Sequence, residues 1–458
     1  MRVSEILTEL TKEISVHVDS TADLAKKSKR EGDRHDEKRR QKGEGPLRRK
    51  SGLEALPHQG RLSTSVWSVL HGLGLSMATD RRGAARGLPE HWAILKYMQA
   101  LRSQNVLFGA GLELSDEGSR TVEYYKAVQS RELGVGFGLA LAEHVLRARH
   151  EDHLVSIVPA DRVLGSGRPG RGHRYRPQYL AEVWRPGGIS RVFAISCKGN
   201  HGDAKTSQEQ LASASAHVEG FHIGEGDRTP ALLFSTEIPA GKRPTEKRPS
   251  ENGIVLHALS ADRDGGYLVS ENTRATFGLE APTKNLDPEP FIEPSGGGKG
   301  SGRAEREPGY RVNPEHHDWF QRTLVRNAAA GVTAFAGDDR STSRYLPFEQ
   351  ETRFLMRFGR THDARLERVD LFGIPFLGTD HVFRLNGALM VAFSGVALDL
   401  LEFLRSGDLE RYRHEVHERR GMWPTCSAAP EWRGPVSVRD DGTVLAVKPF
   451  PEGFDPLR

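Results

Sequence analysis

The sequence predicts an α/β protein built around a mixed sheet, and the order of its apolar segments carries this prediction. Short, β-prone apolar runs bounded by turn signals occur at residues 154–158, 178–184, 191–197, 231–235 and 254–259. A segment of helical composition, 207–218, separates the third run from the fourth, and helical patterns precede the first. Residues 130–260 therefore read as helix, three strands, helix and two strands. We expect a helical N-terminal region before this core and a second mixed α/β domain after it.

The composition favours a protein of the reducing cytoplasm with several domains. The chain has 458 residues, 65 Lys and Arg against 61 Asp and Glu, and a net charge of only +4, so any charged surface must be local. Two cysteines form no disulfide framework and no CxxC zinc motif. The chain has neither a secretory signal nor the ~20 apolar residues that span a bilayer. We expect no membrane partner.

The N-terminal region begins with an expected amphipathic helix at residues 3–15, with Ile6, Leu7 and Leu10 on one face. Residues 26–50 are dense in charge and nearly free of apolar side chains. They are either a solvated, partly disordered arm or a basic arm that contacts nucleic-acid phosphate, although interspersed acids weaken the second interpretation.

Helical patterns then cover much of residues 65–149, including expected helices at 88–102, 119–133 and 135–149. The glycines of residues 134–138 are expected to let a helix lie close against a sheet. No strand precedes them, which argues against a phosphate loop.

The tips of two predicted strands resemble a known active site. The run 191–197 ends on Ser196, Cys197, Lys198 and Gly199, and the preceding strand starts at Gln178 after a proline. A lysine at the end of a central strand, opposite a proline-led strand start, resembles the PD-(D/E)XK nuclease superfamily. The resemblance covers about 130 residues by our element order and implies a restriction-endonuclease-like core.

The resemblance also implies a site that cleaves phosphodiesters with Mg²⁺ or Mn²⁺. Its lysine falls on Lys198, its helix glutamate on Glu132, and its two central acids on Gln178 and Ser196. Both central positions are thus neutral, whereas Mg²⁺ is usually held through one or two carboxylates. Carboxylates that could replace them, together with Glu132, are Glu182, Asp161 and Asp203. Gln208 and Gln210, early in the following helix, could contact either phosphate or solvent.

An arginine-rich loop, residues 165–176, enters the predicted site. It contains the spacing GxGxxG, but a proline and arginines stand where a helix would have to begin, so no dinucleotide fingerprint is present. We expect the loop either to contact phosphate or simply to be solvated. The expected contacts are Arg168, Arg171, Arg174 and Arg176.

The remaining chain divides at a Gly- and Pro-rich segment, 283–313, which is typical of a linker. In the C-terminal part we expect helices at 318–330, 346–358 and 389–404, strands at 371–376 and 382–385, and a hairpin at 436–447. This hairpin turns at Asp441-Gly442. The expected domains are 1–60 (charged helix and arm), 61–282 (helical lead-in and nuclease-like unit) and 314–458 (α+β).

The function that follows is DNA binding with metal-dependent phosphodiester cleavage, of the kind used in restriction, repair or defence. One alternative is a cleavage-dead nuclease fold that serves as a DNA-binding or scaffolding subunit, with protein partners or further copies of itself. Another is an interaction module without nucleic acid.

Overall fold

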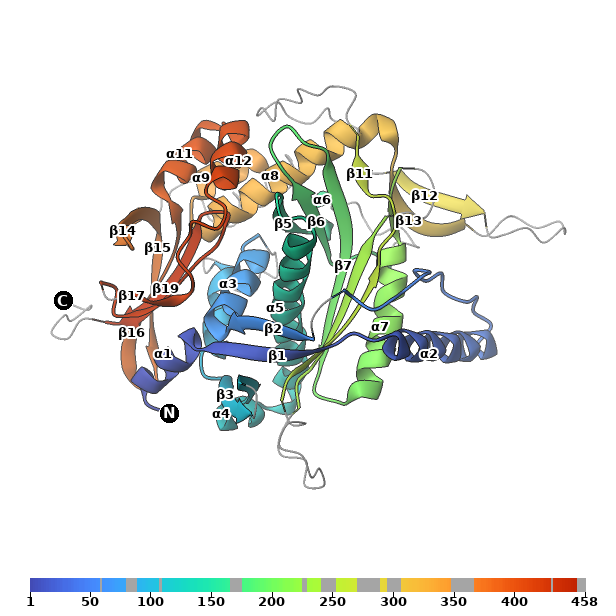
Figure 1. Ribbon diagram of the computed structural model, residues 1–458, viewed down its shortest axis with the longest axis horizontal. Helices are drawn as coiled ribbons and strands as arrows, with labels where there is room; N and C mark the ends of the chain where they lie inside the picture. The colour runs from blue at the N-terminus through green and yellow to red at the C-terminus, as the bar shows by residue number, and fades with distance from the viewer. Residues whose placement is uncertain are drawn as a thin grey trace.

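The protein is mixed α/β, with a curled mixed sheet at its centre and a second, antiparallel sheet at one side (Figure 1). The computed structural model describes residues 1–57, 60–79, 89–106, 109–164, 175–224, 229–239, 253–269, 289–294, 306–346, 366–429 and 431–450. The central sheet has the strand order β2-β1-β10-β9-β7-β6-β5, with the short β11 added beside β7.

The strands of the central sheet come from two separate stretches of the chain, residues 13–65 and 154–268. They are β1 (Glu13–Asp19), β2 (Arg61–Ser65), β5 (Leu154–Pro159), β6 (Tyr179–Trp184), β7 (Ser190–Asn200), β9 (Ala231–Glu237), β10 (Val255–Ala261) and β11 (Tyr267–Leu268). β5, β6 and β7 form an antiparallel meander, and β9 then pairs parallel with β7. The prediction that the first three strands are neighbours in one sheet is confirmed.

Two helices cover opposite faces of this sheet. The apolar side chains of β7 alternate: Phe193 and Ile195 pack with α5 (Glu123–Arg149), while Val192 and Ala194 pack with α7 (Ala204–Glu219). This period of two is what an extended strand buried on both faces requires. α7 also makes the crossover between β7 and β9 that a parallel pair needs.

Glycines bring α5 against the sheet, as the sequence predicts. A Cβ at Gly134 would lie 2.6 Å from the carbonyl oxygen of Lys198, and one at Gly138 would lie 2.7 Å from the sulfur of Cys197. No side chain fits at either distance. α5 is one continuous helix, rather than the expected pair 119–133 and 135–149, because packing against β7 offsets the cost of its interior glycines.

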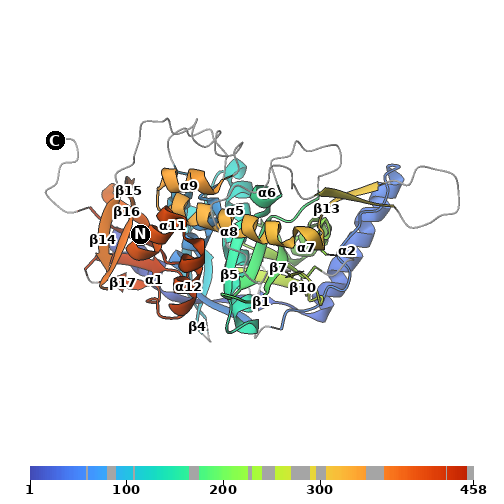
Figure 2. The same ribbon diagram turned by 90° about the horizontal axis from the view of Figure 1, so that it is seen from above.

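The N-terminal region belongs to the central sheet. Helix α1 (Val3–Thr11) buries Ile6, Leu7 and Leu10 as expected. It ends at Thr11 rather than at residue 15, because β1 begins at Glu13. The expectation of a partly disordered arm at 26–50 is wrong over residues 26–41, which belong to helix α2 (Ala22–Gln41). α2 packs against α7 and forms an outer layer at one end of the molecule (Figure 2).

Residues 66–119 hold shorter elements than the sequence suggests. They are α3 (Val66–Met77), the 3-10 helix η1 (Glu90–Tyr97), the hairpin strands β3 (Leu101–Val106) and β4 (Gly109–Leu114), and α4 (Asp116–Ser119). The expected helix 88–102 thus ends early. After β5 the chain forms one helical turn, α6 (Ala160–Val163).

Part of the expected linker is a strand. β13 (Arg306–Val312) pairs with β12 (Glu289–Pro294) and, in parallel, with β8 (Phe221–Ile223), and it buries Val312. β12 also falls within the expected linker, and residues 283–288 and 295–305, including the glycine-rich 295–302, lie outside the described residues.

The C-terminal part contains a six-stranded antiparallel sheet, in the order β14-β15-β16-β19-β18-β17. Its elements are α8 (His317–Phe335), α9 (Asp339–Tyr345), β14 (Glu367–Leu371), β15 (Ile374–Leu385), β16 (Ala388–Ala397), α11 (Leu398–Ser406), α12 (Leu409–Glu418), β17 (Ser427–Ala429), β18 (Gly434–Val438) and β19 (Thr443–Pro449). The hairpin turning at Asp441-Gly442 is confirmed.

Two C-terminal predictions are wrong. The expected helix 389–404 is strand β16 followed by α11, because β16 lies inside the sheet and is apolar on both faces. The expected strand 371–376 is interrupted by the turn between β14 and β15, where Phe372 and Gly373 both have positive φ. Most of the expected helix 346–358 lies outside the described residues. Among the described helices, none is long and apolar enough to cross a membrane.

Candidate functional site

The candidate site lies at the C-terminal end of β7, on the sheet face covered by α7. Ser196 and Lys198 continue the alternation of Val192 and Ala194, so their side chains project to that face. Two residues further on, the Asn200 amide nitrogen donates to Ser207 of α7 at 3.0 Å, which fixes the strand end against the helix.

Gln178 and Ser196 meet each other at this face. The backbone N–H of Cys197 donates to Gln178 Oε1 at 2.6 Å, and the hydroxyl of Ser196 lies 3.5 Å from the same oxygen. Ser196 is fully buried. Gln178 and Ser196, the two positions where the resemblance requires acids, are therefore adjacent. Both side chains are neutral, and their polar atoms lie within hydrogen-bonding distance of each other.

Lys198 is half-buried and its ammonium has no hydrogen bond or ion pair with a described residue. Burial, together with the charge of Arg131 on α5, lowers the pKa of Lys198. The neighbouring Cys197 is fully buried against α5, and burial raises the pKa of its thiol, so it is a core residue as expected. Among the described residues no carboxylate neutralises Lys198, and the positive charge of Arg131 also acts on it.

A row of polar side chains extends from Lys198 across three further strands. Lys198 is in register with Ser235 of β9, Ser235 with His257 of β10, and His257 with Asp19 of β1. Three strand spacings place the two ends of this polar row about 14 Å apart. The row ends three residues before the first residue of α2.

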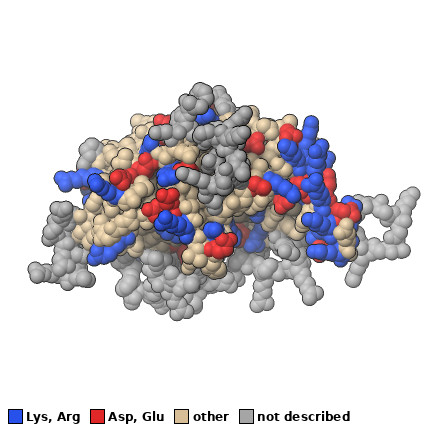
Figure 3. Space-filling view, turned by 90° about the horizontal axis from the view of Figure 1, so that it is seen from below, with Lys and Arg blue, Asp and Glu red and all other residues tan. Residues whose placement is uncertain are grey.

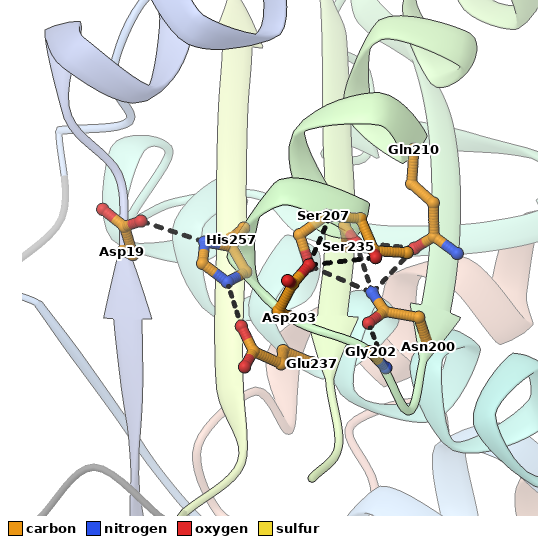
Figure 4. A network of polar contacts seen from close by, with 10 residues as sticks. Asp19, Asn200, Gly202, Asp203, Ser207, Gln210, Ser235, Glu237 and His257 are labelled. Atoms are coloured by element: carbon orange, nitrogen blue, oxygen red, sulfur yellow. Dashed lines mark hydrogen bonds and ion pairs between the residues drawn. The ribbon is translucent and has the colours of Figure 1, made fainter. Parts of the chain in front are cut away.

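The middle of the polar row is a closed hydrogen-bond network around Asn200 (Figure 4). The Asn200 amide donates to Ser207 and to Gln210 Oε1 (3.1 Å), and Ser235 donates to the same Gln210 oxygen at 2.7 Å. Gln210 Nε2 donates in turn to the Gly199 carbonyl at 3.1 Å. Gln210 is therefore committed to internal contacts and does not remain open for phosphate.

The far end of the row is a histidine held between two carboxylates. His257 is 3% exposed, and its Nδ1 and Nε2 lie 2.9 Å from Asp19 and 3.1 Å from Glu237. Burial by itself would lower the pKa of His257, but its hydrogen bonds to Asp19 and Glu237 and their charges outweigh burial, so the pKa is raised. The hydrogen bond to His257 likewise lowers the pKa of Asp19.

The replacement carboxylates proposed from the sequence do not gather at Lys198. Glu132 accepts from Tyr97 at 2.7 Å and pairs with Lys96 at 2.8 Å, on the side of α5 opposite Gly134. Asp203 caps α7 by accepting from the N–H of Thr206 at 2.9 Å.

Glu182 is one of the most completely paired groups in the protein. It is 1% exposed, accepts two hydrogen bonds from Arg413 of α12 (3.0 and 3.1 Å) and a third from Ser190 (2.6 Å). Glu182 lies four residues beyond Gln178 along the chain, but its carboxylate binds Arg413 and so joins β6 of the central sheet to α12 of the C-terminal part.

Asp161 pairs with an arginine at the described end of the predicted arginine loop. Asp161 pairs with Arg176 at 2.5 Å, so this acid and the one described member of the expected arginine contacts neutralise each other. Arg168, Arg171 and Arg174 lie outside the described residues.

The donor set does not fit a divalent cation. No group of three or more His, Cys, Asp or Glu side chains within the described ranges could hold a metal ion. Gln178 and Ser196 offer no charge, and Mg²⁺ takes carboxylates by preference. The Mg²⁺ or Mn²⁺ implied by the resemblance has no matching site at Lys198 among these residues.

Sequence reasoning missed Arg131 and the Asp19–His257–Glu237 cluster. The signal for the cluster was present, since Glu237 ends an apolar strand and His257 interrupts one. Arg131 gave no signal, because its approach to Lys198 depends on how α5 packs on β7. No family model, curated protein or solved structure matches this chain.

Proposed function

We propose that the protein binds nucleic acid through a nuclease-like core that does not cleave. The order α5, β5, β6, β7, α7, β9, with its antiparallel meander and parallel fourth strand, supports the nuclease-like interpretation. It is the order implied by the PD-(D/E)XK resemblance, with the small β8 inserted before β9.

One observation carries the proposal: Lys198 ends β7 at the position that the resemblance assigns to a lysine, while Gln178 and Ser196, at the two acid positions, are neutral and hydrogen-bonded within the chain. A half-buried ammonium without a partner among the described residues attracts anions, and the charge of Arg131 adds to its field. A phosphate group would supply a negative charge there. The cleavage chemistry of the resembled family requires a metal-bound water, and the described residues offer no donor set for that metal.

The proposal is tested by measuring the binding of labelled duplex DNA, by fluorescence anisotropy, over a range of salt concentrations with Mg²⁺ or with EDTA. We expect salt-dependent binding that EDTA does not weaken. Lys198→Met and Arg131→Gln should each reduce the slope of log affinity against log salt by about 1. Arg322→Gln, an exposed cation on α8 without an ion pair to a described residue, is the matched control and should leave the slope unchanged.

Two results would contradict the proposal. Absence of salt-dependent binding by the wild-type protein would favour an interaction module. Nicking of plasmid DNA that requires Mg²⁺ or Mn²⁺ and is lost in Lys198→Ala would instead establish metal-dependent cleavage, because loss of a charge-stabilising donor lowers the rate by about 10²–10³.

A further inference from the structure

Helix α2 carries two rows of side chains with opposite character. Residues spaced by four along one side, Leu24, Ser28, Gly32 and Asp36, are buried. A second row with the same spacing lies about 200° around the helix from the first, given about 100° per residue. It consists of Lys26, Arg30, Arg34, Lys38 and Lys42, all exposed.

The arrangement of these cations, more than their number, distinguishes α2. Residues 22–42 contain nine Lys and Arg and five Asp and Glu, which by count suggests an ordinary solvated helix. All five acids lie outside the basic row. Within the row only Arg34 forms an ion pair with a described residue, Glu31. Off the row, Lys27 pairs with Asp23 at 2.7 Å and Arg40 with Glu37 at 2.8 Å.

The buried row holds α2 firmly against the body of the protein. The helix packs against α7, and Gly32 leaves room for the side chain of Arg49, which would lie 3.2 Å from a Cβ at this position. Asp36 accepts from the N–H of Leu47 at 3.1 Å, and Arg48 pairs with Glu219 of α7 at 2.8 Å. The segment after α2 therefore ties the helix to α7, so the basic row stays opposite the buried row along its whole length.

The resulting surface is a ridge of positive charge at one end of the molecule, where Lys and Arg gather over α2 (Figure 3). Its five cations repeat about every 6 Å along the axis and extend for about 24 Å. We infer that this basic row, Lys26 to Lys42, is a second contact for the phosphate backbone of nucleic acid.

This inference rests on the proposed function and adds a surface to it. α2 begins three residues after Asp19, at the end of the polar row that starts at Lys198. α2 packs on α7, the helix that covers the sheet face to which Lys198 projects, and one nucleic acid would have to contact both surfaces. A membrane surface is the other large polyanion, but the only large apolar side chain of α2, Leu24, is buried, and membrane-surface helices need an exposed apolar face.

The test compares two triple variants with the same loss of charge on the same helix. Lys26→Gln with Arg30→Gln and Lys38→Gln removes three cations from the basic row. Lys27→Gln with Lys29→Gln and Arg40→Gln removes three cations that lie off it. Binding to labelled duplex DNA is measured against salt, and circular dichroism establishes that both variants keep their helix content.

We expect the row variant to lower the slope of log affinity against log salt by about 3, since each neutralised phosphate contributes about 0.9. The off-row variant should lower it by less than about 1. Combining the row variant with Lys198→Met should reduce the slope by the sum of the two effects, as one ligand touching both surfaces requires.

Equal effects of the two triple variants would overturn the inference, because net charge would then explain the binding. A row variant that binds like wild type, while Lys198→Met still weakens binding, would overturn the second contact and leave the proposed function intact. Failure of wild-type protein to bind DNA would overturn both. Row-dependent binding to vesicles containing phosphatidylserine, stronger than binding to DNA, would assign the ridge to membranes instead.

Discussion

Glu182 and Lys198 are charged groups on the same face of neighbouring strands, but their surroundings differ: Glu182 is buried and paired, and Lys198 is half-buried with no ion pair to a described residue. Glu182 is enclosed, and Arg413, reaching over from the C-terminal part, neutralises it with two hydrogen bonds. Lys198 is half-buried, and no described residue pairs with it. His257 lies between these extremes, with a carboxylate on each side.

This difference in pairing distinguishes Glu182, whose ion pair with Arg413 stabilises the fold, from Lys198, whose charge does not. Leaving a charge partly desolvated and unpaired costs free energy, and proteins keep such groups where they bind or react. The carboxylates that could have served a metal are instead distributed among internal partners. The following predictions test that separation, beginning with the largest expected effect.

Glu182→Gln should lower the free energy of unfolding by about 3–5 kcal/mol, because it leaves the guanidinium of Arg413 buried without its counter-charge. The measurement is urea denaturation followed by tryptophan fluorescence. Trp184, whose ring lies 3.6 Å from the Arg413 guanidinium carbon, should report the change locally.

The double variant Glu182→Leu with Arg413→Met is the control. It removes both charges and should recover much of the loss, since apolar residues of similar volume often replace a buried ion pair without cost. A single variant that loses less than about 1 kcal/mol would mean that Glu182 is not structural, and the comparison with Lys198 would fail.

The role of Glu182 could not have been predicted from the sequence, whereas its strand could. Gln178 and Glu182 share a face by the strand period, and the sequence gives that directly. The partner of Glu182 is 231 residues away, on a helix whose position depends on the packing of the second sheet. The adjacency of Gln178 and Ser196 could be predicted from the order of the strands. The proximity of Arg131 to Lys198 could not, because it depends on how α5 packs on the sheet.

The secondary-structure errors also have local causes. The alternation of Ile14, Val16 and Val18 marks β1, but an overlapping helical pattern concealed it. β16 is apolar throughout, so its periodicity could not separate a buried strand from a buried helix. α2 buries only one narrow row of side chains, and packing on α7 stabilises it where composition indicates disorder.

The His257 cluster should make stability depend on pH. The raised pKa means that the folded protein holds the imidazolium proton more tightly than the unfolded chain does. This stabilisation is fully present below the unfolded pKa of about 6.5 and is lost as pH rises through the folded pKa. The unfolding free energy of wild type should therefore fall over this window. His257→Gln should be less stable at low pH and nearly flat through the same window.

Asp19→Asn provides the check on cause, because it removes one of the two carboxylates that raise the pKa while leaving His257 in place. We expect the pH-dependent loss to be smaller in this variant and to be complete at a lower pH, because the folded pKa moves toward the unfolded value. The neighbouring His17 also acts on Asp19, so His17→Gln is needed as a control. If the dependence of stability on pH were unchanged in Asp19→Asn, the carboxylate of Asp19 would not be a cause of the raised pKa of His257.

Lys198→Met should have the smallest effect on stability and the opposite sign. The folded pKa of Lys198 is lowered, so the unfolded chain binds its proton more tightly and Lys198 destabilises the fold at neutral pH. Stability should rise with pH between the folded pKa and the unfolded value of about 10.4. At neutral pH the variant should therefore match wild type within about 0.5 kcal/mol or exceed it, and any gain should shrink toward pH 10. Urea denaturation across this range measures both. A clear loss of stability would mean that Lys198 has an internal partner, and the contrast with Glu182 would disappear.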